Sequence, residues 1–246
     1  MNIQPRIAPV GDSALLVELG RSIDPTLQAA VSALEQAISR EPHPAIIEWV
    51  PTYCSLMVYY NPLQVSYQEL ASWLEQRCQR LEQTGPIQRR LVTLPVLYGG
   101  EMGPDLAAVA QHCRLSEQEV IALHKEPDYL VYMLGFLPGF PYLGGLPRQL
   151  ATPRLSTPRT LVPAGSVGIA DRQTGVYPLA SPGGWQLIGR TPLRLYDATR
   201  PQPFLLAAGD LLRFRAINAA EYAEIAEQVA AGTYQPMIQE EVTSDE

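Results

Sequence analysis

Residues 135–147 read GFLPGFPYLGGLP, and they begin the region that decides the fold of the chain. Four glycines, three prolines and three aromatic residues occupy these thirteen positions. Glycine weakens helices and strand interiors, and proline removes a backbone donor, so the stretch predicts neither a helix nor an ordinary strand interior. We expect a tightly turned segment with aromatic side chains along it.

Around this stretch, from Tyr129 onward, short apolar runs alternate with glycine and proline turns. The runs are YLVYML, TLVPA, SVGIA, GVYPLA, QLIG, LRLY, FLLAA and LLRFRAI. Many short strands at roughly ten-residue spacing predict a β-barrel or a sandwich. LVTLPVLYGG (91–100) is expected to be the strand that enters this domain. Two short helices should follow it, opened by Pro104-Asp105 and by the capping-box pattern at 116–119, and a last helix should run from about 219 to 231.

The first 90 residues predict a separate small α+β unit. SALLVEL (13–19) alternates as a strand does, and Asp24-Pro25 supplies the cap and first residue of a helix. AIIEWV (45–50) and SLMVYY (55–60) read as strands, and a capping box at Ser66 begins a second helix. The order β-α-β-β-α predicts a ferredoxin-like sandwich, completed if a strand returns near Leu91.

The expected fold class is therefore α+β, in two domains and a tail. Residues 1–90 form the ferredoxin-like domain and residues 91–235 form the β-barrel domain. Residues 236–246 are acidic and polar, and we expect them to be disordered.

Charge and composition exclude several classes of function. The formal net charge is −7 and Lys125 is the only lysine, so a nucleic-acid or anionic-membrane surface is not expected. The lone lysine also lacks the neighbours of a Walker A loop. With no long uncharged apolar run and no secretory pattern at the N-terminus, we expect a cytoplasmic protein. Cys54, Cys78 and Cys113 show no CxxC spacing, which indicates reduced, mostly buried thiols.

The local charge of residues 135–192 differs from that of the whole chain. This segment holds ten glycines, nine prolines and five arginines, against Asp171 as its only acid. Arginine grips carboxylate and phosphate groups bidentately, so the segment predicts a site for a small anionic ligand. The alternative is that these arginines pair with acids elsewhere in the fold or face solvent.

The same segment offers bare backbone and aromatic walls. SPGGW (181–185) and PAGSVG (163–168) have N–H groups that can reach an oxyanion, although they would serve equally as barrel corners. Ser166 does not fit a nucleophile elbow, because position 164 is alanine and no helix can follow. Tyr142, Tyr177 and Trp185 either wall a pocket or pack in the barrel core.

Histidines suggest a proton-transfer group and no metal site. His43, His112 and His124 are too scattered to form a metal triad. His124 lies on a short helix just before the glycine-rich region, which makes it the candidate for proton transfer. A capping or core histidine is the alternative.

Taken in order, the motifs resemble those of the KipI / allophanate hydrolase subunit 1 family. They are His124, GFLPGFPYLGGLP, PR at 153–154 and 158–159, VPAGSVGIA (162–170), QTGVYP (173–178), SPGGWQLIGRTP (181–192) and GDLLRF (209–214). The likeness covers nearly the whole chain and is weaker before Leu91. The motifs are specific to the family only as a series in this order and spacing. None of them is specific alone.

The resemblance implies a cyclophilin-like β-barrel after a ferredoxin-like domain, and within the family the likeness is to the 5-oxoprolinase branch. Such a chain works with a larger homologous partner, the C subunit, and with a separate A subunit to open 5-oxoproline to glutamate with ATP, which partner subunits hold or share. Isomerase activity does not follow from a cyclophilin-like fold. The alternatives are an inhibitor of a sensor histidine kinase, a carboxyltransferase component of a urea- or allophanate-related system, and a purely structural module.

Combined with the residues of the glycine-rich segment, the resemblance leads to a hypothesis for the site. Arg154 and Arg159 would grip the anionic group, backbone near Gly183 and Gly184 would stabilise the oxyanion, and His124 would relay a proton. The full set of substrate-binding candidates is Arg154, Arg159, Ser166, Gln173, Tyr177, Gly183, Gly184, Trp185 and Arg190. The candidates for the pocket wall, facing the substrate or the larger partner, are Gly135, Phe136, Gly139, Phe140 and Tyr142.

Overall fold

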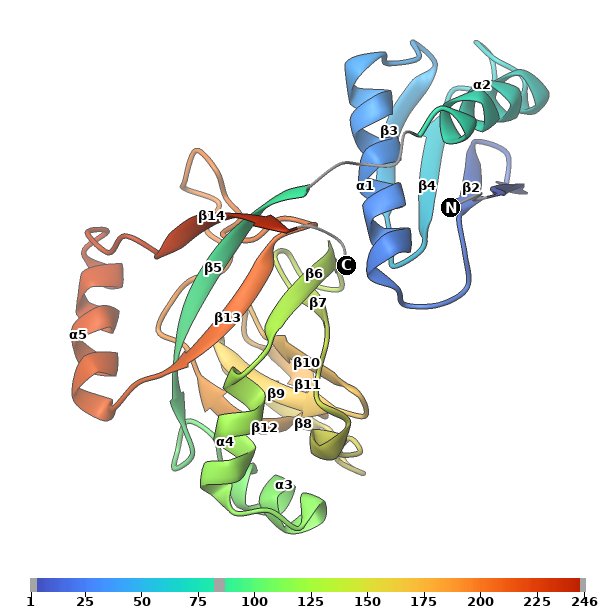
Figure 1. The fold of residues 1–246 in the computed structure, drawn as a ribbon. Coiled ribbons are helices and arrows are strands. Elements are labelled where there is room, and N and C mark those ends of the chain that lie inside the picture. The colour runs from blue at the N-terminus through green and yellow to red at the C-terminus, as the bar shows by residue number, and fades with distance from the viewer. Residues whose placement is uncertain (1–3, 82–86, 244–246) are drawn as a thin grey trace. The chain divides into compact units, whose positions relative to one another are not determined.

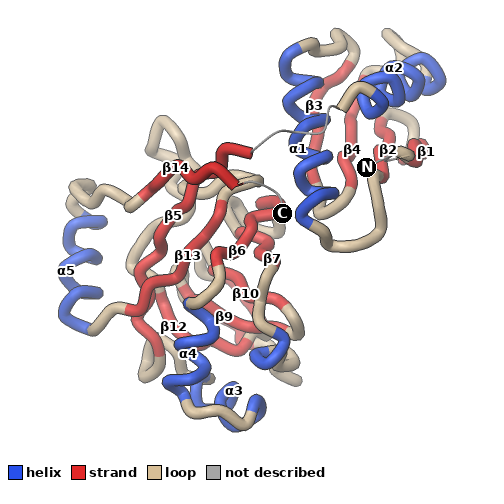
Figure 2. The backbone as a smooth tube through the Cα atoms, viewed as in Figure 1, coloured by secondary structure: helices blue, strands red, loops and turns tan. Residues whose placement is uncertain are grey.

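The structure, a computed structural model, describes residues 4–81 and 87–243 of the chain. It is a mixed α+β protein in which the chain separates into two compact units, with one boundary between Ile87 and Gln88 and a second between Glu241 and Val242 (Figure 1). Strands dominate the second unit, whereas helices and strands contribute comparably to the first (Figure 2).

The first unit consists of one antiparallel sheet and two helices. Its strands lie in the order β1-β2-β4-β3. Helix α1 packs on β3 and β4, and α2 packs on β1 and β2, so that leucine, valine and isoleucine side chains fill the space between the helices and the sheet. The elements are β1 (Arg6–Val10), β2 (Ala14–Glu18), α1 (Pro25–Arg40), β3 (Ile46–Pro51), β4 (Ser55–Tyr60) and α2 (Tyr67–Gln79).

Local sequence signals explain where the helices of this unit begin. The Asp24 carboxylate accepts a hydrogen bond from the Thr26 N–H at 2.8 Å and Pro25 is the first helical residue, as the sequence predicted. Ser66 and Glu69 form the predicted capping box at the start of α2. The strands predicted within 13–19, 45–50 and 55–60 are confirmed as β2, β3 and β4.

The expectation that a strand near Leu91 would complete this sheet is wrong. No strand returns near Leu91, because β5 (Ile87–Tyr98) pairs with strands of the second unit. The outer position beside β2 is taken instead by β1, whose sequence RIAPV shows no alternation of apolar and polar residues. Pro9 is tolerated there because β1 is an edge strand, on which one side needs no ladder hydrogen bonds.

The second unit is built on an eight-stranded sheet that nearly closes into a barrel. Its order is β10-β9-β12-β5-β13-β6-β7, with β14 paired to β5, and the terminal strands β10 and β7 contact each other. Strands β8 and β11 form a separate ribbon. The strands after β5 are β6 (Asp128–Leu134), β7 (Pro141–Gly144), β8 (Arg159–Val162), β9 (Ser166–Ala170), β10 (Gln173–Val176), β11 (Ser181–Gly183), β12 (Gln186–Arg190), β13 (Leu211–Ala216) and β14 (Ile238–Thr243).

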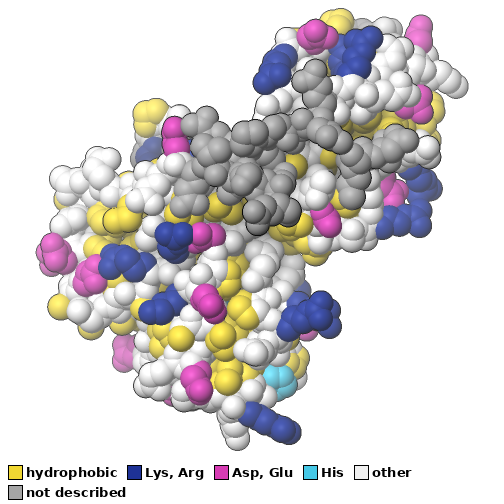
Figure 3. All heavy atoms as spheres, in the orientation of Figure 1, with side chains coloured by type: hydrophobic (Ala, Val, Ile, Leu, Met, Phe, Trp, Pro, Cys, Tyr) yellow, Lys and Arg dark blue, Asp and Glu magenta, His cyan; other side chains and the backbone are white. Residues whose placement is uncertain are grey.

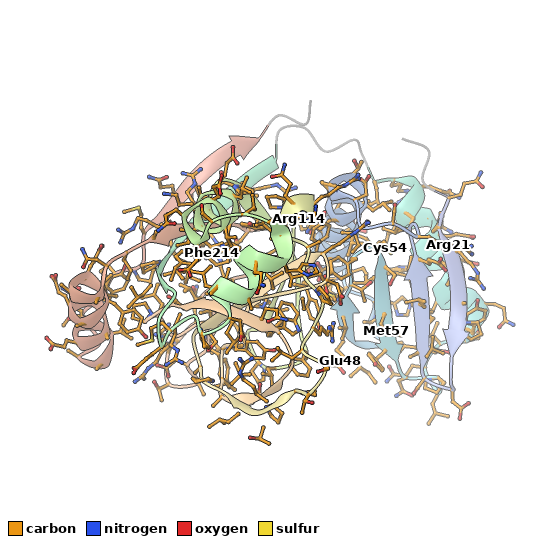
Figure 4. The ribbon with its side chains drawn as sticks, turned by 90° about the horizontal axis from the view of Figure 1, so that it is seen from below. Arg21, Glu48, Cys54, Met57, Arg114 and Phe214 are labelled. Atoms are coloured by element: carbon orange, nitrogen blue, oxygen red, sulfur yellow. The ribbon has the colours of Figure 1, made fainter. Side chains whose placement is uncertain are left out.

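Helices lie outside this barrel and a large apolar core fills it. The helical elements are α3 (Leu106–Cys113), α4 (Glu117–Lys125), the 3-10 turn η1 (Arg148–Leu150) and α5 (Ala219–Ala230). Helix α5 lies on one side of the barrel, and α3 and α4 lie at one end (Figure 1). The capping box at Ser116 and the last helix are confirmed. Helix α3 packs on β12 and α4 packs on β13, the strand that carries Phe214 (Figure 4).

Three sequence expectations for the second unit need correction. LRLY (193–196) and FLLAA (204–208) are not strands but share a single bridge between Tyr196 and Phe204, since a turn through Asp197 separates them. Part of the tail expected to be disordered is strand β14, which is ordered by pairing with β5, and residues 244–246 lie outside the described residues. Within GFLPGFPYLGGLP, Pro141–Gly144 is strand β7, where proline is acceptable as the first residue.

Two further expectations concern thiols and membranes. Cys78 is buried and burial raises its pKa to about 11, whereas Cys54 (Figure 4) and Cys113 are only partly buried; all three are free thiols. Among the helices of residues 4–81 and 87–243, none has the length and apolar character needed to span a membrane.

Candidate functional site

Five of the predicted substrate-binding residues meet around the β8–β11 ribbon. Arg159 on β8 lies opposite Gly183 on β11, and its Nη1 donates a hydrogen bond to the Trp185 carbonyl at 3.3 Å. The Tyr177 and Trp185 rings contact edge to face, with centroids 6.2 Å apart. The group of Arg154, Arg159, Tyr177, Gly183 and Trp185 is called the Trp185 cluster below.

The aromatic residues of this cluster are packed rather than open to solvent. Phe140 makes edge-to-face contacts with Tyr142, Tyr177 and Trp185, with centroid distances of 5.4, 5.6 and 5.7 Å. Phe140 and Tyr177 are each only 2% exposed and Trp185 is 9% exposed. The rings therefore form a small second core beside the barrel, and only Tyr142, which is half-buried, keeps a partly open edge.

Gly183 is required by the close approach of Tyr177. A Cβ atom at position 183 would lie 2.4 Å from the Tyr177 Oη, closer than any real contact of this kind. At Gly184 a Cβ atom would meet its nearest neighbour, the Leu155 carbonyl oxygen, at 3.6 Å, which is ordinary contact. The two adjacent glycines, both predicted to stabilise the oxyanion, thus differ in the space available for a side chain: position 183 has none and position 184 has enough for a methyl group.

Arg159 is held by an acid that the sequence did not single out as a site residue. Its Nη2 donates to the Asp105 Oδ1 at 2.7 Å, and the Asp105 Oδ2 accepts the Leu187 N–H at 2.6 Å. Asp105 does stand at the N-cap of α3, yet its carboxylate makes no capping hydrogen bond. The arginine is therefore committed to a structural ion pair that crosses 54 residues of sequence.

Arg154 is the more available of the two predicted anion-binding arginines. Its side chain is 57% exposed, and its Nε lies 3.4 Å from the carboxylate of Asp171, which is itself 64% exposed. Its guanidinium stands 6.0 Å from the Trp185 ring centroid. Burial raises the pKa of Tyr177 while Arg154 and Arg159 act to lower it, so both cations lie within electrostatic reach of the phenol.

Ser166 and Arg190 meet in a second place, across strands β9 and β12. They are direct cross-strand partners, and each has a buried polar atom with no hydrogen-bond partner, the Ser166 Oγ and the Arg190 Nε. Gln173 lies away from them, at the opposite end of the β9–β10 hairpin, where it pairs with Ala170. The predicted substrate-binding residues thus do not form one site. Five lie in the Trp185 cluster, Ser166 and Arg190 pair across β9 and β12, and Gln173 lies at the β9–β10 turn.

The proton-relay role predicted for His124 does not fit its surroundings. Its side chain is fully buried on α4, where the Nδ1 lies 2.8 Å from the Tyr98 Oη and the Nε2 lies 2.8 Å from the Thr174 Oγ1. Because the Thr174 hydroxyl donates to the Gly168 carbonyl, the Nε2 carries the proton and the Nδ1 accepts from Tyr98.

Burial also lowers the pKa of His124 to about 3, so the ring stays neutral near pH 7. The ring packs on Phe214, the residue labelled in Figure 4, with centroids 4.5 Å apart. Both ring nitrogens are occupied and the side chain is closed to solvent, which is the environment of a core histidine.

The first part of GFLPGFPYLGGLP, residues 135–140, is the hairpin loop between β6 and β7. The Gly135 N–H donates to the Phe140 carbonyl at 3.1 Å and Gly139 has a φ of +80°, as expected of glycines that turn the chain. Gly144 instead makes room for Tyr132. At the loop tip, Phe136 has a φ of +63° and is 69% exposed, an unusual combination for an aromatic residue.

Comparisons with known proteins agree on one family. Residues 5–206 match the family described as carboxyltransferase domain, subdomain C and D. The chain is 43% identical to the B subunit of 5-oxoprolinase from Bacillus subtilis over 232 residues, which covers 90% of this chain and 97% of that protein. It is 46% identical to the B subunit of 5-oxoprolinase from Escherichia coli O157:H7 over 209 residues, covering 83% and 93% of the two chains.

A solved structure has a similar sequence and fold. The crystal structure of TTHA0988 superposes with a TM-score of 0.74 at 39% identity, and the match covers 84% of this chain and 40% of that longer one. The family expected from the order of the glycine- and proline-rich motifs is thereby confirmed. The chain belongs to the carboxyltransferase subdomain C and D family.

Proposed function

We propose that the chain is the B subunit of an ATP-dependent 5-oxoprolinase, which opens the lactam of 5-oxoproline to give glutamate. The observation that carries the proposal is the likeness, over nearly the full length of both chains, to two proteins named as the B subunit of 5-oxoprolinase. Those names describe one member of a larger enzyme, which supports the expectation that the chain acts with partners. Homologues of the A and C subunits are the candidates.

In this proposal Arg154 binds the substrate carboxylate and Arg159 has a positioning role. Arg154 is exposed and weakly paired, so its guanidinium has donors to offer to a ligand. Arg159 uses its fork on Asp105 and on the Trp185 carbonyl, and so fixes the strand that carries the site. Backbone N–H groups near Gly183 and Gly184 remain the proposed donors to the developing oxyanion. His124 has no part in this mechanism.

ATP is proposed to bind outside the Trp185 cluster. The triphosphate of ATP needs several cations or a cradle of backbone N–H groups, and Arg154 is the only loosely held cation among the five residues of the cluster. Residues of partner subunits would then supply most of the nucleotide contacts. The finer fold assignments, a ferredoxin-like first unit and a cyclophilin-like second unit, are part of the same proposal.

Phe136 is proposed to contact one of these partners. It is a large apolar side chain held at the tip of a hairpin loop in a strained backbone conformation and left 69% exposed. Leu161 on β8, at 63% exposure, is a second large apolar side chain open to solvent in this unit. Contact with a partner would give both side chains an apolar environment.

Reconstitution tests the proposed function directly. ATP-dependent conversion of 5-oxoproline to glutamate is measured with homologues of the A and C subunits, with and without this chain. Turnover that requires this chain supports the proposal. Equal turnover without it would contradict the proposal, provided that size-exclusion chromatography shows the three chains to associate.

A further inference from the structure

The second unit has a pocket that shares no residue with the Trp185 cluster. Its volume is about 270 Å³, and it is lined by β5, by the segment 193–205, and by the end of α5 together with the chain leading into β14. It is called the Arg90 pocket below and is defined by Arg90, Arg194, Arg200, Phe204, Tyr234 and Ile238.

The charged side chains that line this pocket are all arginines. Arg90, Arg194 and Arg200 contribute to its wall, and no acidic side chain of residues 4–81 or 87–243 does so. Two carboxylates pair with these arginines from behind the wall, Asp210 with Arg90 and Asp197 with the other two. Three cations therefore face two anions, which leaves a net positive pocket in a chain of net charge −7.

The pairing of Arg194 and Arg200 is weak. Both approach the same Asp197 oxygen, at 3.5 and 3.6 Å, which is longer than a good charge-assisted hydrogen bond. The other Asp197 oxygen accepts two hydrogen bonds from Thr199, at 3.0 Å from its N–H and 2.6 Å from its hydroxyl. The Arg200 Nη1 also donates to the Arg194 carbonyl at 3.2 Å. These contacts do not use all the N–H groups of the two guanidiniums, so some are available to a ligand.

Arg90, by contrast, is held in a fixed orientation. Its Nε and Nη2 donate to the two Asp210 oxygens at 2.9 and 2.5 Å, and Asp210 is only 6% exposed. Asp210 also accepts the Ala207 N–H at 2.7 Å, so the same carboxylate fixes the arginine and the chain that follows residue 205. One side of the pocket is thus preorganised, and the other side has loosely held arginines that can adjust to a ligand.

The remaining walls are mainly apolar and partly open, with Gln202 as a polar side chain among them. Phe204 and Ile238 are 44% and 43% exposed, which is high for large hydrophobic residues of this unit. Phe204 is supported from one side by the Tyr196 ring, with centroids 5.2 Å apart. Basic, acidic and hydrophobic side chains are interspersed on the face that carries α5 and β14 (Figure 3). Apolar walls with a few convergent charged groups are typical of small-molecule sites.

We infer that the Arg90 pocket binds a small organic anion, one with a carboxylate or phosphate group for Arg194 and Arg200 and a compact apolar body for Phe204 and Ile238. The inference does not depend on the proposed function, since it rests on residues outside the Trp185 cluster. In a 5-oxoprolinase, such a site would take a substrate, a product or a regulatory metabolite of the same chemical class.

Isothermal titration calorimetry on the full chain tests this inference with three probes: L-5-oxoproline, L-glutamate and inorganic phosphate. 2-Pyrrolidinone, the same ring as 5-oxoproline without its carboxylate, is the neutral control. At least one anion should bind, 2-pyrrolidinone should not, and higher salt should weaken binding. Arg200→Gln should lower the affinity for that anion about tenfold or more, the usual effect of losing a charged hydrogen-bond donor.

Control variants assign any binding to one location. Arg6→Gln changes an exposed arginine of the first unit and should leave affinity unchanged. Arg154→Gln changes the Trp185 cluster, so binding lost in Arg154→Gln but retained in Arg200→Gln would overturn the inference while supporting the proposed site. Arg194→Gln serves as a second pocket variant, with thermal melting as the check of folding. Absence of binding by all three anions would overturn the inference as well.

Discussion

Asp105 and Arg159 form a 2.7 Å ion pair that joins the beginning of α3 to strand β8. The Asp105 side chain is 12% exposed and that of Arg159 is 28% exposed, so the pair is largely withdrawn from solvent. Because the second carboxylate oxygen binds the Leu187 N–H, one aspartate fixes a helix, the β8–β11 ribbon and strand β12 together. The Trp185 cluster depends on this connection for its shape.

Replacing Asp105 by asparagine should therefore destabilise the protein. Asp105→Asn keeps the size of the side chain but leaves the Arg159 guanidinium without its counter-ion, and we expect the free energy of unfolding to fall by about 1–3 kcal/mol. Urea denaturation measures the change. Arg6→Gln breaks the exposed pair with Glu18 and should cost less than about 1 kcal/mol. Equal losses in the two variants would show that the Asp105 pair is no more important than a surface pair.

Adjacent glycines should respond differently to the same substitution. Gly183→Ala places a methyl group 2.4 Å from the Tyr177 Oη, and the resulting shift should cost about 1–3 kcal/mol of stability. Gly184→Ala, with its nearest neighbour at 3.6 Å, should cost much less. Tyr177→Phe removes the closest atom and should restore part of the loss when combined with Gly183→Ala. A double variant no more stable than Gly183→Ala would contradict the assigned clash.

His124 should make stability depend on pH. Burial lowers its pKa from 6.5 to about 3 in the folded protein, so below pH 6.5 the unfolded chain binds a proton that the folded chain does not. The contribution of the neutral His124 to stability is fully present above pH 6.5 and is lost as the pH falls toward 3. Between pH 7 and pH 5 this histidine alone should account for about 2 kcal/mol.

Denaturation of the His124→Gln variant at pH 7 and pH 5 measures that contribution. The free energy of unfolding should change less between the two pH values in this variant than in the wild type. The exposed His112 on α3 provides the matched control, and His112→Gln should keep the wild-type difference. If His124→Gln loses stability between pH 7 and pH 5 as steeply as the wild type, the buried neutral histidine is not the cause of the slope.

Arg154 should be needed for substrate binding in the assembled enzyme. If it grips the substrate carboxylate, Arg154→Gln should raise the KM for 5-oxoproline about tenfold or more with a smaller effect on kcat. Arg148, an exposed arginine six residues earlier in η1, is the matched control, and Arg148→Gln should leave both constants near the wild-type values. Unchanged kinetics in Arg154→Gln would remove this residue from the proposed site.

Local signals were sufficient for most elements of the fold. Capping boxes at Ser66 and Ser116 and the Asp24-Pro25 pair are short-range hydrogen-bonding patterns, and the structure contains all three. Strand β1 could not be recognised, because RIAPV shows no alternation and contains Pro9, which argues against a strand interior. The strand forms through its pairing with β2. The pairing of β14 with β5 is likewise a tertiary effect.

The sequence indicated the region of the candidate site but not its geometry, and the roles of the predicted residues stay proposals. The glycine-, proline- and arginine-rich segment did bring Arg154, Arg159, Tyr177, Gly183 and Trp185 together. The sequence could not show that Arg159 is occupied by Asp105, because that contact joins residues 54 positions apart. Nor could it show that the scattered residues of the Arg90 pocket converge.

The position of β1 bears on the order in which the two units can be completed during synthesis. All strands and helices of the first unit lie within residues 6–79, so its sheet has every member once that length of chain has left the ribosome. The second unit pairs Leu91 on β5 with Leu211 on β13 and also needs β14, so its barrel must wait for almost the last residue. Long-range pairing of this kind slows folding. A nascent chain should therefore carry a complete first unit while the barrel of the second unit still lacks strands.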